Sequence, residues 1–211
     1  MEIRANTSYR LERVVWIESR EDDGRMVIRR SRRVGADGNV AEFLVATGTP
    51  PLEPTVENST FWRDEDTIAT RARLAGGRTV TAPRLPGPPT HHSIGLDLAE
   101  RLLADSEFHV RAAGNGTTRL VADGPVDLDE SEVSVAVAPP RNATASIVVS
   151  RDGLVTALRV TYETTYLGDR TEVVITHRLF DVGETNVERP AWVDETSVER
   201  SASLDGTGSS E

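Results

Sequence analysis

The chain has 211 residues, with 34 acidic and 24 basic side chains and a formal net charge of −10. Its basic residues are all arginine, and cysteine is absent, which excludes disulfides, thiol nucleophiles and cysteine-ligated zinc. The acidic balance also disfavours nucleic acid as a partner, because phosphates require a basic surface.

The first part of the chain is predicted to be a series of strands. Short runs of alternating apolar and polar residues are separated by Gly- and Asp-containing turns, which is typical of an antiparallel meander. The expected strands are 9–19, 25–34, 40–47, 59–63, 67–74 and 79–82. In the arginine-rich segment 25–34, the arginines are interleaved with Met26, Val27 and Ile28. We expect this strand to face the acids of the preceding turn, Glu18, Glu21, Asp22 and Asp23, rather than nucleic acid.

One helix is predicted, over residues 93–105. Leu98, Ala99 and Leu102 share one side of it at the spacing of an amphipathic stripe, and Ser93 is a suitable N-cap. Strands are expected again after the helix, at 108–112, 117–122, 133–138, 143–150, 154–166 and 170–182. Residues 1–193 are expected to form a single domain. The acidic Ser/Gly-rich tail, 194–211, lacks apolar partners and is expected to be disordered.

The hairpin formed by residues 154–182 is predicted to be amphipathic. A turn at Gly168-Asp169 would place Leu158 opposite Leu179, and Val160 opposite His177. By the same pairing, Tyr162 would lie opposite Ile175 and Thr164 opposite Val173, all on one apolar face. The other face would be polar and would bring Arg159 opposite Arg178.

These elements predict an α+β fold that is mostly antiparallel β. The expected architecture is a curved sheet, or incomplete β-barrel, of about 11 strands with the main helix inserted after the sixth strand. A helix of this length spans only about 20 Å and is too short to cover such a sheet. Part of the concave face is therefore expected to stay open.

Catalytic and metal-binding motifs are weak throughout the chain. His91 and His92 precede Asp97 and Glu100 without the spacing of a metal site, and Ser93 lies in no nucleophile elbow. The carboxylate pairs Asp64/Asp66 and Asp127/Asp129 do not have the spacing of a calcium loop. The sequence therefore predicts no enzyme, no metal and no cofactor.

His177 has two interpretations, because it is predicted to lie on the apolar face. It could be a core histidine that is hydrogen-bonded to a hydroxyl such as that of Tyr162. It could also be the polar group that orients a ligand in an apolar pocket. Pro190 and Trp192 are expected to hold the end of the C-terminal strand against the core.

Four of the six asparagines begin an Asn-x-Ser/Thr sequon: Asn6, Asn58, Asn115 and Asn142. This excess favours an exported, glycosylated surface, whereas turn asparagines in a Thr-rich β protein are the alternative. The acidic surface without lysine is suited to concentrated salt, where charge repulsion is screened. A GC-rich codon bias would also explain the use of arginine.

The sequence of Gly153–Val193, which ends in Pro190-Ala191-Trp192, resembles the end of a family of haloarchaeal lipoproteins of uncharacterised role. That family is similar to the LolA and LppX/LprG lipoprotein-carrier superfamily. The resemblance implies an incomplete antiparallel barrel with a helical lid that holds lipid, outside the cytoplasm. It also implies that membrane association depends only on an upstream segment with a signal peptide and a lipid-modified cysteine.

We therefore expect an extracytoplasmic, non-enzymatic domain that binds a hydrophobic ligand, with lipid as the first choice, on its concave face. The predicted ligand-binding residues are Leu98, Leu102, Val160, Tyr162, Tyr166, Ile175, His177 and Leu179. The alternative is a cell-surface structural or protein-interaction module whose core is filled by its own side chains.

Overall fold

A computed structural model describes residues 7–84, 96–114, 116–128 and 138–194. The strands of the first half are β1 (Tyr9–Ser19), β2 (Arg25–Val34), β3 (Val40–Gly48), β4 (Val56–Arg63), β5 (Ile68–Leu74) and β6 (Thr79–Arg84). The helix α1 (Leu96–Asp105) follows. The second half contains β7 (Phe108–Gly114), β8 (Thr117–Ala122), β9 (Arg141–Ser150), β10 (Val155–Tyr166) and β11 (Asp169–Phe180).

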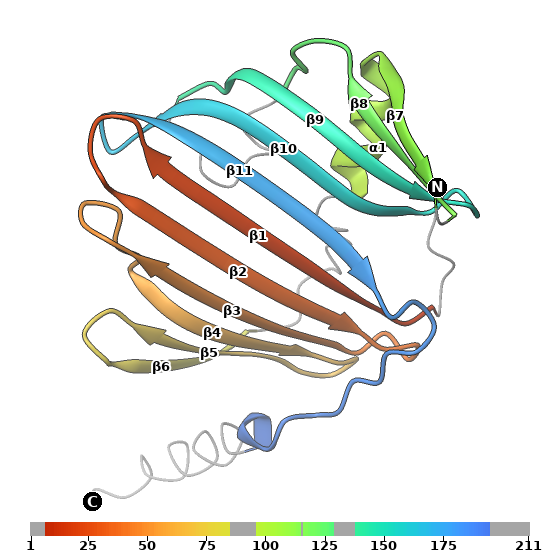
Figure 1. Cartoon of the computed structure of the whole chain (residues 1–211). Helices are drawn as coiled ribbons and strands as arrows, with labels where there is room; N and C mark the ends of the chain where they lie inside the picture. The colour runs from red at the N-terminus through yellow and green to blue at the C-terminus, as the bar shows by residue number, and fades with distance from the viewer. Residues whose placement is uncertain (1–6, 85–95, 115, 129–137, 195–211) are drawn as a thin grey trace, which may run out of the picture.

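All eleven strands belong to one open antiparallel sheet, which is curved and does not close into a barrel (Figure 1). The strand order is β6-β5-β4-β3-β2-β1-β11-β10-β9-β8-β7, so β1 pairs with β11 at the centre and joins the two halves. Helix α1 lies on one side of the sheet, behind β9 and β10 in this view, and it contacts β10 (Figure 1). The predicted fold class, with one main helix after the sixth strand, is confirmed.

The two faces of the sheet differ in what covers them. The inner face, which carries Ile17, Tyr162 and Val173, packs against Ala99 and Leu102 of α1 in one large apolar cluster. The outer face carries Trp62 on β4 and Ala69 on β5, which belong to a second, smaller cluster. Because side chains alternate along a strand, each sheet face has its own separate core.

The observed hairpin of β10 and β11 differs from the predicted pairing by two residues. Leu158 pairs with His177, and Tyr162 with Val173, because the two central turn residues are Leu167 and Gly168, both at positive φ. This is the primed turn geometry that matches strand twist. The predicted turn at Gly168-Asp169 is therefore wrong. The predicted faces are correct, since a shift of two residues leaves every side chain on the same face.

The same shift removes the predicted juxtaposition of two arginines. Arg159 lies opposite Thr176, and Arg178 lies opposite Ala157. The predicted strand at 133–138 and the start of the predicted helix fall largely outside the described residues, as does the tail from residue 195.

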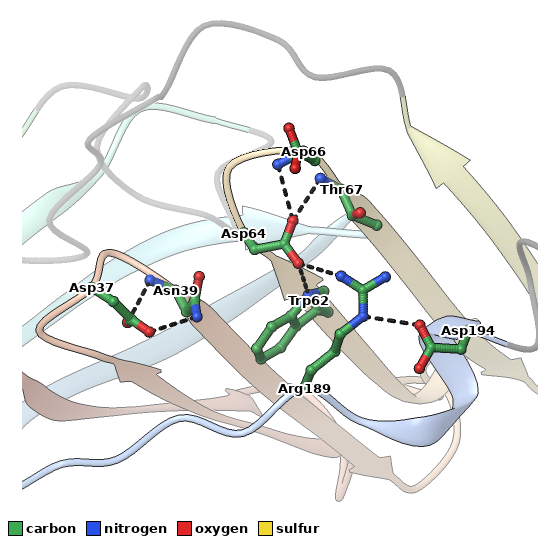
Figure 2. Close-up of polar contacts among 8 residues, drawn as sticks. All are labelled: Asp37, Asn39, Trp62, Asp64, Asp66, Thr67, Arg189 and Asp194. Carbon is green, nitrogen blue, oxygen red and sulfur yellow. Dashed lines mark hydrogen bonds and ion pairs between the residues drawn. The ribbon is translucent and has the colours of Figure 1, made fainter.

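The chain after β11 crosses to the outer face of β3–β5. Val187 and Val193 are buried against Trp62, with Trp192 packed beside them, which confirms that Trp192 holds this segment against a core. Figure 2 shows the polar contacts that accompany this packing: Asp64 accepts a hydrogen bond from Trp62 Nε1 at 3.0 Å and pairs with Arg189 at 2.5 Å. Arg189 also bonds Asp194 at 3.0 Å, so one guanidinium joins the segment to β4.

The pKa of Asp64 lies below its ordinary value of 3.8. Burial by itself raises this pKa, but hydrogen bonds from Trp62, Thr67 and Asp66 and the charge of Arg189 together lower it. A depressed folded-state pKa stabilises the fold above the unfolded pKa, and this contribution is lost as the pH falls through the folded value.

We therefore expect acid to weaken the attachment of the C-terminal segment. In Asp64→Asn, the fall in unfolding free energy below about pH 4 should be shallower than in the wild type, because the titrating carboxylate is gone. Urea unfolding between pH 2.5 and 6 measures this slope. Asp66→Asn removes an exposed acid from the same turn and should keep the wild-type slope. An unchanged slope in Asp64→Asn would contradict the assignment.

Candidate ligand-binding face

The structure brings the predicted ligand-binding residues together, but mostly inside the closed core. Leu102, Val160 and Tyr162 are fully buried, Ile175 is nearly so, and Leu98 packs among them. Tyr166 is partly buried against the same cluster. Side chains of α1 and of the chain around Val126 and Leu128 fill the inner face here. Contact of a ligand with these side chains stays a prediction.

His177 and Leu179 lie at the border of this closed core. With Leu11 and Leu158 they line a small pocket of about 10 Å³, which is about the space that one water molecule needs. His177 is only 5% exposed and lies opposite Arg13 of β1. The predicted hydrogen bond to Tyr162 is not made, because the Tyr162 hydroxyl has no hydrogen-bond partner in the described part of the chain.

Beyond β1, the inner face carries a set of apolar side chains that are only half-buried. The side chains at these positions alternate inward along β2–β5, and no described residue of α1 belongs to a cluster with them. They are Val34, Val40, Leu44, Phe61, Ile68, Ala72 and Leu74. We call this set of side chains, which no described helix residue covers, the open apolar surface.

A polar row crosses the boundary between the closed core and the open apolar surface. Arg13 of β1 lies opposite Arg30 of β2, and Arg32 lies opposite Glu42 of β3. Glu42 accepts from Arg32 at 2.8 Å and pairs with Arg30 at 3.3 Å. We call Arg13, Arg30, Arg32 and Glu42 the guanidinium row. Its acid comes from β3, so the expectation that the preceding turn neutralises this strand is wrong for Arg30 and Arg32.

Burial changes the pKa of two groups on the inner face, Arg13 of this row and Tyr162 of β10. Burial, with a smaller effect from Arg30, lowers the pKa of Arg13 from 12.5 to about 10. Burial raises the pKa of Tyr162 to about 12, and the charge of Arg13 opposes this rise. Arg13 and the Tyr162 hydroxyl therefore interact electrostatically, although the two residues lie on different strands.

Sequence reasoning missed the guanidinium row and most of the open apolar surface. A signal was present, since Arg30 and Arg32 follow Met26 and Ile28 at the two-residue period of one strand face. The partners expected for segment 25–34 follow from its charge alone, whereas its two-residue period indicates which arginines share the apolar face.

The remaining predicted sites are placed as follows. Asn58 lies on the outer face, opposite Val45, and Asn142 is exposed and donates to Glu163 at 3.2 Å. Asn6, Asn115, His91 and His92 lie outside the described residues.

Among the residues that the structure describes, no three His, Asp or Glu side chains are grouped as metal ligands. No helix in the same ranges has both the length and the apolar character needed to cross a membrane.

The sheet topology and the position of α1 together define an open antiparallel β-sheet protein with one main helix packed on its inner face. No family model and no curated protein matches the chain. Among solved structures it is similar to a DUF1329 family protein from Desulfovibrio piger, with 9% identity, a TM-score of 0.29 and 92% coverage of each chain. It is also similar to a protein domain from Vibrio parahaemolyticus described as outer membrane lipoprotein-sorting, with 8% identity, a TM-score of 0.28 and 90% coverage of each chain. Likeness of this degree carries no functional argument.

Proposed function

We propose that this domain binds a hydrophobic ligand, a lipid in the first instance, on the concave inner face, and that it does so without catalysis. The observation that carries the proposal is the open apolar surface on β2–β5. A domain gains stability by burying such side chains, so a set of half-buried apolar side chains on a concave face is typical of a binding surface.

The proposed site extends from the open apolar surface to the border of the closed core. Leu44 and Phe61 lie near its centre, and His177 and Leu179 lie at its border with the core. The four sequons support an extracytoplasmic, glycosylated domain, and the two that are described lie away from the proposed ligand. We place the domain at the cell surface on this basis.

A second candidate function is favoured by the closed half of the inner face. The side chains under α1 are closely packed, with Leu102, Val160 and Tyr162 at 0% exposure. This is the interior expected for a surface structural or protein-interaction module. The two functions differ in whether the open apolar surface takes up a small amphiphile.

Binding of monolauroylglycerol, a neutral single-chain lipid, tests the proposal. We expect a one-to-one complex by native mass spectrometry and a ligand mass on protein purified from its own host. Phe61→Ser should lower the affinity, measured by calorimetry, about tenfold or more, because a buried aromatic ring is lost from the contact.

Phe43→Ser is the matched control, since Phe43 lies on the neighbouring strand with its side chain on the outer face and 48% exposed. This variant should bind as the wild type does. Thermal unfolding of both variants separates loss of binding from loss of fold. A protein that carries no ligand and takes up no monolauroylglycerol would leave the second candidate.

A further inference from the structure

We propose that the guanidinium row binds the anionic head of the ligand, so that the ligand class is an amphiphile with a phosphate or a similar oxyanion. This inference rests on the proposed function and deepens it. The open apolar surface alone does not distinguish neutral from charged lipids. The guanidinium row favours a charged lipid over a neutral one, because it places positive charge next to that surface.

The register of the strands puts the row beside the apolar positions. Arg30 lies opposite Leu44, and Glu42 lies opposite Phe61, on the same face. A chain bound along Leu44 and Phe61 therefore ends next to a guanidinium group.

The charge of the row is unusual for this chain. Three guanidinium groups and one carboxylate form it, whereas the whole chain has a formal net charge of −10. Arg13 and Arg30 lie directly opposite each other, and like charges in such a pair destabilise a sheet. An anion between or beside them would relieve this repulsion.

The row is also accessible from the open surface. The Arg30 side chain is 34% exposed and that of Arg32 is 22% exposed, whereas Glu42 is more deeply placed at 13%. The two arginine side chains are thus more exposed than the carboxylate that pairs with them. Guanidinium groups match phosphate and carboxylate oxygens with two parallel hydrogen bonds.

An independent observation comes from Tyr162. This side chain is 0% exposed, and its hydroxyl has no hydrogen-bond partner among the described residues. Tyr162 lies on the same inner face as Arg13, and the charge of Arg13 acts to lower the pKa of this hydroxyl. Most buried polar groups in folded proteins make a hydrogen bond, and a ligand oxygen near Arg13 would accept one from the Tyr162 hydroxyl.

Three probes test the inference in one buffer at constant salt: lauroyl lysophosphatidate, monolauroylglycerol and inorganic phosphate. The first two share the acyl chain and glycerol, and differ only by the phosphate. The wild type is expected to bind lysophosphatidate at least tenfold more tightly than monolauroylglycerol, as for one or two charge-assisted hydrogen bonds.

Variants assign this preference to residues. Arg30→Gln and Tyr162→Phe should each lower the ratio of the affinities for lysophosphatidate and monolauroylglycerol at least threefold. Glu42→Gln should raise the affinity for lysophosphatidate, because it removes the competing carboxylate. Arg29→Gln makes the same charge change on the same strand, but on the outer face, and should have no effect.

The outcomes separate the inference from the proposed function. Equal affinity for the two lipids, or a preference that survives in both Arg30→Gln and Tyr162→Phe, would overturn the anion site but keep a lipid-binding domain. Failure of both lipids to bind would reject the proposed function. Binding of inorganic phosphate alone, lost in Arg30→Gln, would then support an oxyanion site whose natural ligand is a free phosphate.

Discussion

Trp62→Ala is expected to lower the free energy of unfolding by about 3–5 kcal/mol, the range for removing a large aromatic side chain from a core. Trp62 is 1% exposed, and the outer-face cluster is built around it. Its loss leaves a cavity between β4 and the C-terminal segment and removes the hydrogen bond to Asp64. Urea unfolding measures the change. Limited proteolysis should also cut earlier within residues 184–194.

Two variants locate the source of this effect. Trp62→Phe keeps most of the apolar contact but loses the indole N–H, so it should cost less than the alanine variant. Trp16→Ala removes the same side chain from a half-buried position on the same face, and its cost should also be smaller. A change below about 1 kcal/mol in Trp62→Ala would show that the segment is not held by this cluster.

Leu102→Ala is expected to lower the free energy of unfolding by about 2–5 kcal/mol, because it removes a fully buried leucine between α1 and the sheet. The neighbouring variant Leu103→Ala is the control. Leu103 is 36% exposed on the same helix, and its replacement should change stability by about 0.5 kcal/mol or less.

The same variant tests the predicted ligand contact of Leu102. If α1 only closes the core, then Leu102→Ala loses stability but binds monolauroylglycerol with unchanged affinity. If α1 moves to admit the lipid, the lost leucine changes that affinity as well. A stable Leu102→Ala protein would contradict the packing of α1 on the inner face.

The elements of this fold could largely be predicted from the sequence. The bounds of β1 and β2 agree with the expected ranges 9–19 and 25–34, because alternation and Gly/Asp turns are local signals. The burial of Tyr162, His177 and Leu179 was also predictable, since one alternation places them on a single face. The pairing was not, because Leu167 adopts a positive φ that its residue type does not predict.

The candidate site was predictable only in part. The length of the helix indicated that some of the concave face stays open. Which part stays open depends on where α1 docks, and the described part of α1 packs mainly beside β10. The sequence therefore pointed to the closed half of the inner face, and the half-buried Leu44 and Phe61 lie on the other half.

The sequence by itself determined the strands, the helix and the face of each side chain, because these follow from periods of two and 3.6 residues along the chain. Only the tertiary structure decided that α1 covers one half of the sheet and that residues 184–194 cover the outer face of the other. It also decided that Glu42 lies between Arg30 and Arg32. Such contacts join residues that are distant in the chain, and the packing of whole elements selects them rather than any local pattern.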